Sequence, residues 1–314
     1  MNRLHWMVLP LGLLCGALWA VEKEKDDNDE KPGNKTEGRS EHKRTEDKDG
    51  GLIGQAKPGG SARVNGISYH GGPVMLGTTT VYYIFYGNWP AAVTPTDSST
   101  RSILTDFAKN IGGSAYFNIN TTYYNGSNQK VSNSVAYGGS IDDNYSQGTV
   151  LTDSNVFTIV SNAITSGKFP NNANAVYFVL TSKDVNESSG FCTQYCGWHT
   201  YGTVNSTKIK YSFVGDPGRC ITSCAYQSVG PNLNAGADGM VSIIAHELEE
   251  AVTDPQLNAW YDSRGYENAD KCAWTFGTMY TANGAKANMH LGSRDYLIQR
   301  NWVNASGGSC ALTY

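Results

Sequence analysis

The stretch from Ile243 to Pro255 reads "IIAHELEEAVTDP" and carries a histidine and three glutamates among apolar residues that indicate a partly buried helix. His246 and Glu250 are four residues apart, so a helix places them on one face. A histidine and a carboxylate in this arrangement can hold a metal ion, and Glu247 between them can deprotonate a metal-bound water. Buried carboxylates are costly unless they are paired or bind a metal. The stretch is therefore a candidate metal centre.

This spacing is that of the zincin helix, H-E-x-x-H, with Glu250 in place of the second histidine. A carboxylate remains a competent zinc ligand, although its negative charge makes the bound water less acidic. The bare pattern is weak, because His and Glu are common on helices. The structural alternative is an acidic helix face in solvent, with His246 hydrogen-bonded to Glu250.

Two further acidic residues lie downstream, in "NAWYDSRGYENADKCAW". Glu267 follows Glu250 by 17 residues, about where thermolysin-like zincins carry their third ligand, and Asp270 lies just beyond it. In those enzymes such an aspartate orients the first histidine through its free ring nitrogen. The sequence thus predicts zinc bound by His246, Glu250 and Glu267, with Glu247 as the catalytic general base and Asp270 supporting His246.

Three other residues are weighed for this centre. Asp254, one turn beyond Glu250, is a rival third ligand, but it can instead cap the turn at Pro255. His70 and His199 each sit among Gly and aromatic residues, where a hydrogen-bonded structural role competes with substrate or metal binding. His199 is the stronger alternative ligand, because the cysteines beside it would fix its position.

The elements that must position these residues follow from hydrophobic patterning. Residues 78–89 and 175–182 are β-branched and aromatic runs that predict buried strands. Residues 97–112 and 153–170 show apolar residues at helical spacing, with Asp or Ser at the start. The helix that carries His246 should begin at Asp238 or Gly239 and end near Thr253, before Pro255. Strands that alternate with amphipathic helices predict a mixed α/β fold.

The N-terminal region is expected to be processed and exported. Residues 1–20 have the layout of a signal peptide, with Arg3 ahead of an apolar run that is too short to span a bilayer. Residues 21–60 form a charged segment and a Gly-rich linker that should be disordered, because almost nothing in the charged part is apolar. Residues 61–314 are expected to form one globular domain.

The cysteines and glycosylation motifs fit a secreted protein. Six cysteines follow the signal peptide, which suggests three disulfides in one of 15 possible pairings. A structural zinc site at the two C-x-x-x-C pairs is the alternative. Seven N-x-S/T motifs predict glycans on surface loops, at Asn34, Asn120, Asn125, Asn144, Asn186, Asn205 and Asn304.

Composition excludes several classes of function. The formal net charge is −4 and the predicted domain has no basic cluster, which argues against nucleic acid as a partner. No apolar run of spanning length follows residue 20, so no membrane is expected as a partner either. There is no G-x-S-x-G motif, and the cysteines look paired, so a serine or cysteine hydrolase finds no support.

Several blocks resemble, in order, those of the phosphate-induced protein family that includes the plant EXORDIUM proteins. They are "SYHGGPVMLGTTTVYYIFYGNW", "VYFVLTSKDV", "FCTQYCGWH", "YSFVGDPGRCITSCAYQ", "AHELEEAVTDPQLNAWYD" and "ENADKCAW". The family's H-E-L-x-E pattern falls on His246, Glu247 and Glu250, and its E-x-x-D-x-C pattern falls on Glu267, Asp270 and Cys272. Plant members tend to have Asn where this chain has Asp254. The resemblance implies an extracellular protein linked to the cell wall and growth, without an established reaction.

Two functions are therefore expected as alternatives. The first is a secreted zinc-dependent hydrolase, peptidase-like, with a peptide or cell-wall substrate. The second is a non-catalytic extracellular or wall-associated protein whose aromatic and Asn-rich surface binds glycans. The sequence leaves the substrate and the oligomeric state open.

Overall fold

The computed structural model describes residues 66–89 and 99–314, together with the backbone of Ser40–Glu41. The predicted signal peptide (1–20) and the charged segment and linker (21–60) lie outside these residues, apart from Ser40–Glu41. A six-stranded sheet, four α-helices and five two-stranded sheets make up most of the described part.

The elements have the following bounds. The strands are β1 (Ser40–Glu41), β2 (Ser68–Tyr69), β3 (Thr79–Tyr86), β4 (Val135–Asp143), β5 (Val150–Leu151), β6 (Ala175–Thr181), β7 (Asn186–Glu187), β8 (Gly197–Val204), β9 (Thr207–Gly215), β10 (Trp260–Tyr261), β11 (Tyr280–Ala282), β12 (Ala285–Ala287), β13 (Met289–Leu291), β14 (Arg294–Tyr296), β15 (Asn301–Val303) and β16 (Ser309–Ala311). The α-helices are α1 (Thr100–Asn110), α2 (Asp153–Thr165), α3 (Ile221–Cys224) and α4 (Ala235–Thr253). Three 3₁₀ turns are η1 (Phe117–Thr122), η2 (Pro217–Arg219) and η3 (Asp270–Cys272).

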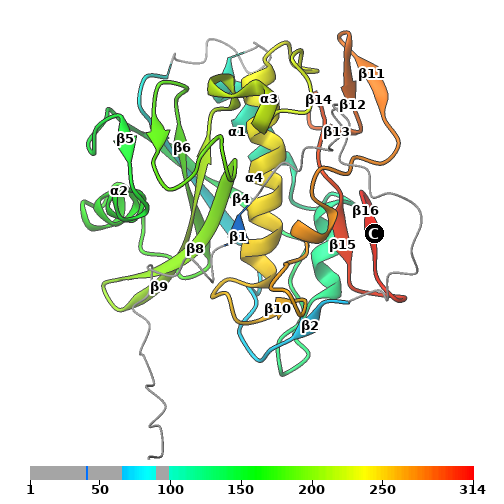
Figure 1. Cartoon of the computed structure of the whole chain (residues 1–314). Helices are drawn as coiled ribbons and strands as arrows, with labels where there is room; N and C mark the ends of the chain where they lie inside the picture. The colour runs from blue at the N-terminus through cyan, green and yellow to red at the C-terminus, as the bar shows by residue number, and fades with distance from the viewer. Residues whose placement is uncertain (1–39, 42–65, 90–98) are drawn as a thin grey trace, which may run out of the picture. The chain divides into compact units, whose positions relative to one another are not determined.

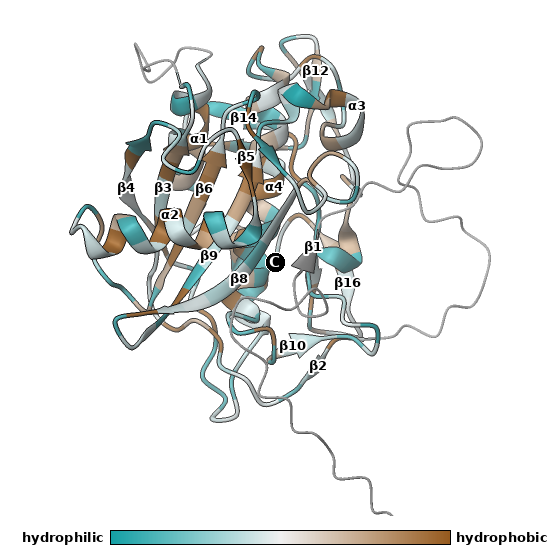
Figure 2. Ribbon diagram, turned by 60° about the vertical axis from the view of Figure 1, so that its left-hand side comes forward, coloured by the Kyte–Doolittle hydropathy of each residue, from teal (hydrophilic) through white to brown (hydrophobic). Residues whose placement is uncertain are grey.

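The central sheet has the order β1-β8-β9-β6-β3-β4. β4, β3, β6 and β9 run parallel, whereas β8 returns antiparallel beside β9 and β1 lies antiparallel to β8. Helices α1 and α2 connect the parallel strands and lie on opposite faces of the sheet, as the views in Figure 1 and Figure 2 show. The prediction of a mixed α/β fold is confirmed.

The middle strands are apolar along their whole length because both faces of the sheet are covered. Every residue of β6 is buried, and so are seven of the eight residues of β3. Ile84 of β3 pairs with Val179 of β6, which in turn pairs with Phe213 of β9. The hydrophobic colouring of these strands in Figure 2 follows this core. Both strands predicted from the sequence are thus present.

The two connecting helices follow their predicted patterns closely. α1 begins after Ser99, whose side chain accepts a hydrogen bond from the Ser102 amide, and α2 begins after Thr152, which forms a capping box with Asn155. The apolar positions at helical spacing are buried in both helices. Gly167 takes a positive φ of 74° directly after α2, which explains why the helix stops there.

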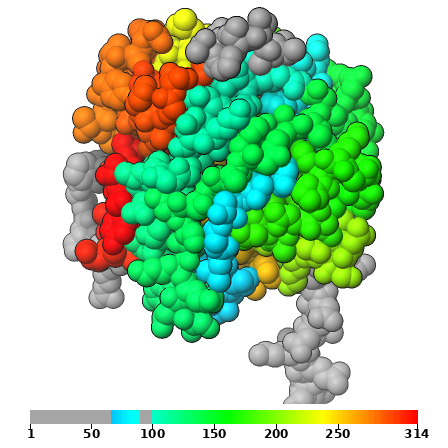
Figure 3. All heavy atoms as spheres, turned by 180° about the vertical axis from the view of Figure 1, so that it is seen from behind, coloured from blue at the N-terminus to red at the C-terminus, as the bar shows by residue number. Residues whose placement is uncertain are grey.

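The C-terminal part consists of three antiparallel hairpins, β11–β12, β13–β14 and β15–β16. α4 lies between the sheet and these hairpins (Figure 1). In the view from behind, residues of the N-terminal half form most of the surface, and the hairpins in orange and red flank them (Figure 3).

Three disulfides join the six cysteines, as the even count predicts. Cys192 pairs with Cys220 and Cys196 with Cys224, so the start of β8 is tied to the segment that precedes α4. Cys272 pairs with Cys310, which ties η3 to β16. The two C-x-x-x-C pairs are therefore disulfide partners of each other, not a zinc site.

The structure sorts the predicted glycosylation motifs by burial. Asn120 in η1 is fully buried, so a glycan at this position is incompatible with the fold. Asn205 lies in the exposed turn between β8 and β9, where its φ is 46°. The prediction of a surface position thus fails for Asn120 and holds for Asn205.

Candidate metal centre

Helix α4 is the element on which the centre is built. It starts at Ala235, earlier than the predicted Asp238, because the Asn234 side chain accepts a hydrogen bond from the Ala237 amide and caps the first turn. It ends at Thr253, as predicted. Every residue from Gly236 to Thr253 is buried, so its histidine and glutamates face protein on all sides.

Along α4, His246 and Glu250 lie one turn apart, as the pattern requires. His246 Nε2 is 3.0 Å from Glu250 Oε1. Both side chains have no exposed surface. The structural alternative was an acidic helix face in solvent, and the structure does not show it. The contact between His246 and Glu250 that this alternative included is present.

Strand β8 brings His199 to the same place. His199 Nδ1 lies 3.4 Å from Glu247 Oε2 and 3.4 Å from Glu250 Oε2. This approach requires a small residue at Gly197, since a Cβ there would lie 2.5 Å from Ile243 Cγ2. The histidine considered as an alternative ligand is thus in direct contact with the predicted ligands and the predicted base.

The downstream segment supplies the remaining carboxylates. Glu267 Oε1 lies 3.6 Å from His199 Nε2, and Asp270 Oδ1 lies 3.4 Å from His246 Nε2. The Asp270 amide donates a hydrogen bond to Glu250 Oε1 at 3.0 Å, which fixes the segment against α4. The Cys272–Cys310 disulfide anchors it from the other side.

These residues form two groups of possible metal donors that share Glu250. One group is His199, Glu250 and Glu267, and the other is His246, Glu250 and Asp270; within each, one donor atom per residue lies within 4.8 Å of the others. The sequence had placed Glu267 with His246 and Asp270 behind it. The structure places Glu267 beside His199 and Asp270 beside His246. Asp270 thus neighbours the histidine that the sequence assigned to it, whereas Glu267 neighbours His199 instead of His246. No signal in the sequence indicates this change of partner, because it depends on how β8 crosses α4.

Burial and neighbouring charges shift the pKa values in opposite directions. Burial raises the pKa of Glu247 to about 7, although His199 and His246 act to lower it. Burial also acts to raise the pKa of Glu250, but the two histidines outweigh it and the pKa is lowered. Burial raises the pKa of Glu267 well above its usual value. Glu250 is therefore the carboxylate most strongly held in its ionised form.

Three buried donor atoms at the centre have no hydrogen-bond partner: His199 Nε2, Glu247 Oε1 and Glu267 Oε1. Buried polar atoms in folded proteins are paired in the great majority of cases, so each of these needs an explanation. Imidazole nitrogen and carboxylate oxygen are the donors that zinc takes besides thiolate. The donor set therefore fits a bound metal cation.

Asp254 and His70, which the sequence offered as further candidates, lie outside both donor groups. Asp254 Oδ1 accepts hydrogen bonds from the Asn258 and Ala259 amides and so closes the turn after α4. His70 is exposed and stacks on Tyr261, with ring centroids 3.7 Å apart.

One residue that sequence reasoning left without a role is Glu249. It is fully buried, and its Oε2 accepts a hydrogen bond from Asn301 Nδ2 at 2.5 Å. Burial raises its pKa well above the usual value. The sequence does contain a signal for a separate role of Glu249. Glu249 and Glu250 are adjacent, and a helix cannot turn two adjacent side chains toward the same face.

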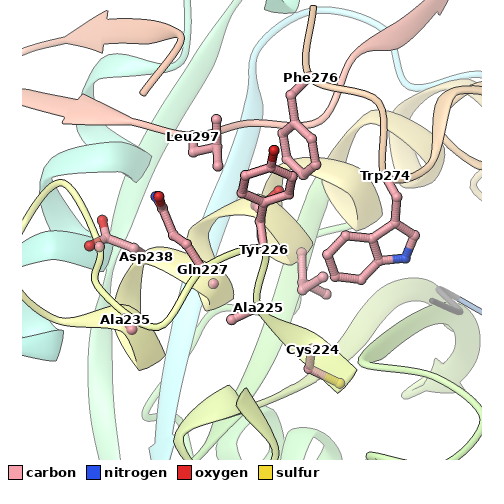
Figure 4. Close-up of a pocket in the computed structure, with 13 residues that line it drawn as sticks. Cys224, Ala225, Tyr226, Gln227, Ala235, Asp238, Trp274, Phe276 and Leu297 are labelled. Carbon is pink, nitrogen blue, oxygen red and sulfur yellow. The ribbon is translucent and has the colours of Figure 1, made fainter. Parts of the chain in front are cut away.

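A small cavity lies beside the first half of α4 (Figure 4). Its lining includes Asp238, Ser242 and Ile243 from the helix and the aromatic rings of Tyr226 and Phe276. At about 20 Å³ it can hold one water molecule but no substrate. Its lining contains no residue of either donor group.

Comparison with known proteins places the chain in a family. The model of the phosphate-induced protein 1 conserved region matches residues 67–292, a range that contains every residue of both donor groups. The chain belongs to the phosphate-induced protein 1 family. Within the part of the chain that the structure describes, no helix is long and apolar enough to cross a membrane.

Relatives in plants support this membership. The chain is 30% identical to Protein EXORDIUM-like 3 of Arabidopsis thaliana, over 77% of this chain and 82% of the relative. It is 30% identical to Protein EXORDIUM-like 5 of the same plant, over 80% and 79%. It is 29% identical to Protein PHOSPHATE-INDUCED 1 of Nicotiana tabacum, over 62% and 67%. No solved structure matches the chain.

Proposed function

We propose that this family member is a secreted, metal-dependent hydrolase of peptide-type bonds, with zinc bound by His199, Glu250 and Glu267. The observation that carries the assignment is the pair of buried, unpartnered atoms His199 Nε2 and Glu267 Oε1, which face each other at 3.6 Å. This separation is longer than a hydrogen bond. Glu250 completes the donor group.

The separation fits a zinc ion between the two atoms. Ligands bound at about 2.0–2.2 Å in tetrahedral geometry lie roughly 3.3–3.6 Å apart. A bound zinc supplies a water of lowered pKa and polarises a carbonyl group. Three protein ligands would leave the fourth position for water or substrate, as catalytic zinc sites require.

Glu247 is the group that would accept the proton. Its Oε2 is 3.4 Å from His199 Nδ1, while its Oε1 has no hydrogen-bond partner. A pKa of about 7 suits a general base at neutral pH, because the carboxylate is available and still accepts a proton readily. His246, 3.0 Å from Glu250 Oε1, holds that carboxylate in position.

The approach of a substrate is expected along the segment that carries Glu267 and Asp270. Their side chains are 4% and 10% exposed, whereas those of His199, Glu247 and Glu250 are fully buried. Residues 263–266, directly before Glu267, are exposed. Secretion is supported by the three disulfides, which persist in oxidising compartments.

The test compares Glu247→Gln with Glu249→Gln in hydrolysis of casein and of a library of internally quenched peptides. The Glu247→Gln protein should keep its metal and fold but lose hydrolysis by 10²-fold or more, since a positioned base contributes about that factor. Glu249→Gln is the matched control on the same helix, since glutamine keeps the size of the side chain and an oxygen that can accept the hydrogen bond from Asn301. Equal activity in the two variants contradicts the role of Glu247. No hydrolysis by metal-loaded wild-type protein would favour the non-catalytic, glycan-binding alternative.

A further inference from the structure

The cluster around α4 contains more donors than one zinc ion uses. Two imidazoles and three other carboxylates surround the Glu250 carboxylate, and each of the six side chains lies within 3.6 Å of another. A catalytic zinc takes three protein ligands. His246, Glu247 and Asp270 therefore remain beyond the ligands of that zinc; the proposed function uses Glu247 as a base and His246 only to position Glu250.

We infer that the cluster holds two divalent metal ions, bridged by Glu250, with His199 and Glu267 on one ion and His246 and Asp270 on the other. This assignment rests on the proposed metal-dependent function and adds a second ion to it. Two-metal hydrolytic sites have ions about 3.5–4 Å apart, a spacing that one carboxylate spans with its two oxygens.

Glu250 turns one carboxylate oxygen toward each histidine, as a bridging ligand would. Its Oε2 faces His199 Nδ1 at 3.4 Å, and its Oε1 faces His246 Nε2 at 3.0 Å. Glu250 is also the residue that the two donor groups share. On each side of Glu250 lie one histidine and one further carboxylate. A single ion would need such a pair of donors on one side only.

Unpartnered atoms are an independent sign that the cluster binds cations. His199 Nε2, Glu247 Oε1 and Glu267 Oε1 are buried without a hydrogen-bond partner, and the side chains are at most 4% exposed. Hydrogen bonds within the cluster therefore do not provide partners for all of its buried polar atoms. Metal coordination is the interaction that nitrogen and carboxylate oxygen donors have in common.

Charge balance favours two ions over one. Among the described residues, Glu247, Glu250, Glu267 and Asp270 form ion pairs with His199 and His246. Histidines that ligate a metal are neutral, so the four carboxylates in their deprotonated, metal-binding form would keep two excess negative charges around one dication. Two dications balance all four, and an uncompensated buried charge is strongly unfavourable.

The test is the metal stoichiometry of the full chain. Protein treated with a chelator and desalted is titrated with Zn²⁺ alone and with Co²⁺ alone, and bound metal is counted by elemental mass spectrometry. The wild type should bind two ions per chain, and Asp270→Asn should bind one. Asp270→Asn keeps an acceptor oxygen for the Glu267 amide, so the local turn is preserved. Asp142→Asn, a change at an exposed carboxylate, should still bind two.

Cobalt supplies a readout that a structural role would not change. Two Co²⁺ ions that share a carboxylate couple magnetically, so the electron paramagnetic resonance signal should weaken as the second equivalent binds and should remain in Asp270→Asn. One ion per chain in both wild type and Asp270→Asn overturns the second site and leaves the proposed function intact. Two ions in Asp270→Asn overturns the assignment of Asp270. No bound metal in folded wild type overturns both.

Discussion

His199 Nε2 on β8 faces Glu267 Oε1, from the loop before η3, at 3.6 Å. The two residues come from opposite sides of α4 in the sequence, and both side chains are buried. Neither atom has a hydrogen-bond partner. A histidine from the sheet and a glutamate from the C-terminal part are thus held together at a distance that suits a shared metal ion.

Replacement of His199 should remove the metal that it shares with Glu267. We expect His199→Ala to lose at least one equivalent of bound zinc and to show less stabilisation by added zinc in thermal unfolding. His290→Ala is the matched control, because His290 has a side chain that is 63% exposed and lies outside both donor groups. Equal zinc content in the two variants would show that His199 is not a ligand.

Gly197 sets the distance between β8 and α4. A Cβ at this position would lie 2.5 Å from Ile243 Cγ2 and 3.3 Å from Glu247 Oε1, so Gly197→Ala must push the strand away from the helix. We expect a loss of about 1–3 kcal/mol in the free energy of unfolding, together with weaker zinc binding. Gly66→Ala, where nothing lies within 4 Å, should change neither quantity. Urea unfolding and zinc titration measure the two effects. Unchanged zinc affinity in Gly197→Ala would show that the position of β8 does not affect zinc binding.

The Cys272–Cys310 disulfide should support the centre as well as the fold. It anchors η3, which begins with Asp270, to β16. Replacing both cysteines by serine should cost about 2–5 kcal/mol of stability and lower the affinity for metal, because the segment with Glu267 and Asp270 loses its anchor. Chemical denaturation and metal titration test this. A variant that loses stability but keeps full metal affinity would show that α4 alone positions the carboxylates.

The raised pKa of Glu187 predicts that the stability of the fold depends on pH, independently of any bound metal. Burial is the main reason why its pKa rises to about 8. A carboxyl group with a raised pKa in the fold contributes stability below its unfolded pKa, and this contribution is lost as the pH rises through the folded pKa. Wild type should therefore lose stability between about pH 4.5 and 8 relative to Glu187→Gln.

The control for this pH dependence is Asp184→Asn. Hydrogen bonds from Ser182 and Tyr145 lower the pKa of Asp184, so its contribution is present above its unfolded pKa and is lost only on acidification. The difference between wild type and Asp184→Asn should stay constant from pH 5 to 8. Thermal unfolding across this range measures both differences, and a constant difference for Glu187→Gln as well would contradict the raised pKa.

Periodicity predicts the regular elements of this chain well. The β-branched and aromatic runs that become β3 and β6, and the apolar spacing of α1 and α2, each follow from local rules. The predicted start of α4 was wrong because Asn234, a good cap, precedes two alanines and a glycine that carry no periodic signal. The β8–β9 hairpin was not predicted, since His199 and its polar neighbours interrupt the alternation.

The composition of the centre follows from the sequence, but its arrangement does not. The H-E-x-x-E spacing places His246, Glu247 and Glu250 within one turn by helix geometry alone. The positions of His199 and Glu267 depend on how β8 and the downstream loop pack on α4, which are contacts between distant segments. Local rules contain no information about which of two histidines meets which of two carboxylates.

Metal content decides whether this cluster is a metal centre. Mature protein purified from a secretory host, without added metal or chelator, is to be analysed by elemental mass spectrometry beside His199→Ala. We expect at least one zinc ion per chain in the wild type and a clear loss in the variant. Wild-type protein that is folded and free of metal would contradict the metal centre and leave the six side chains as a buried network of hydrogen bonds and shared protons.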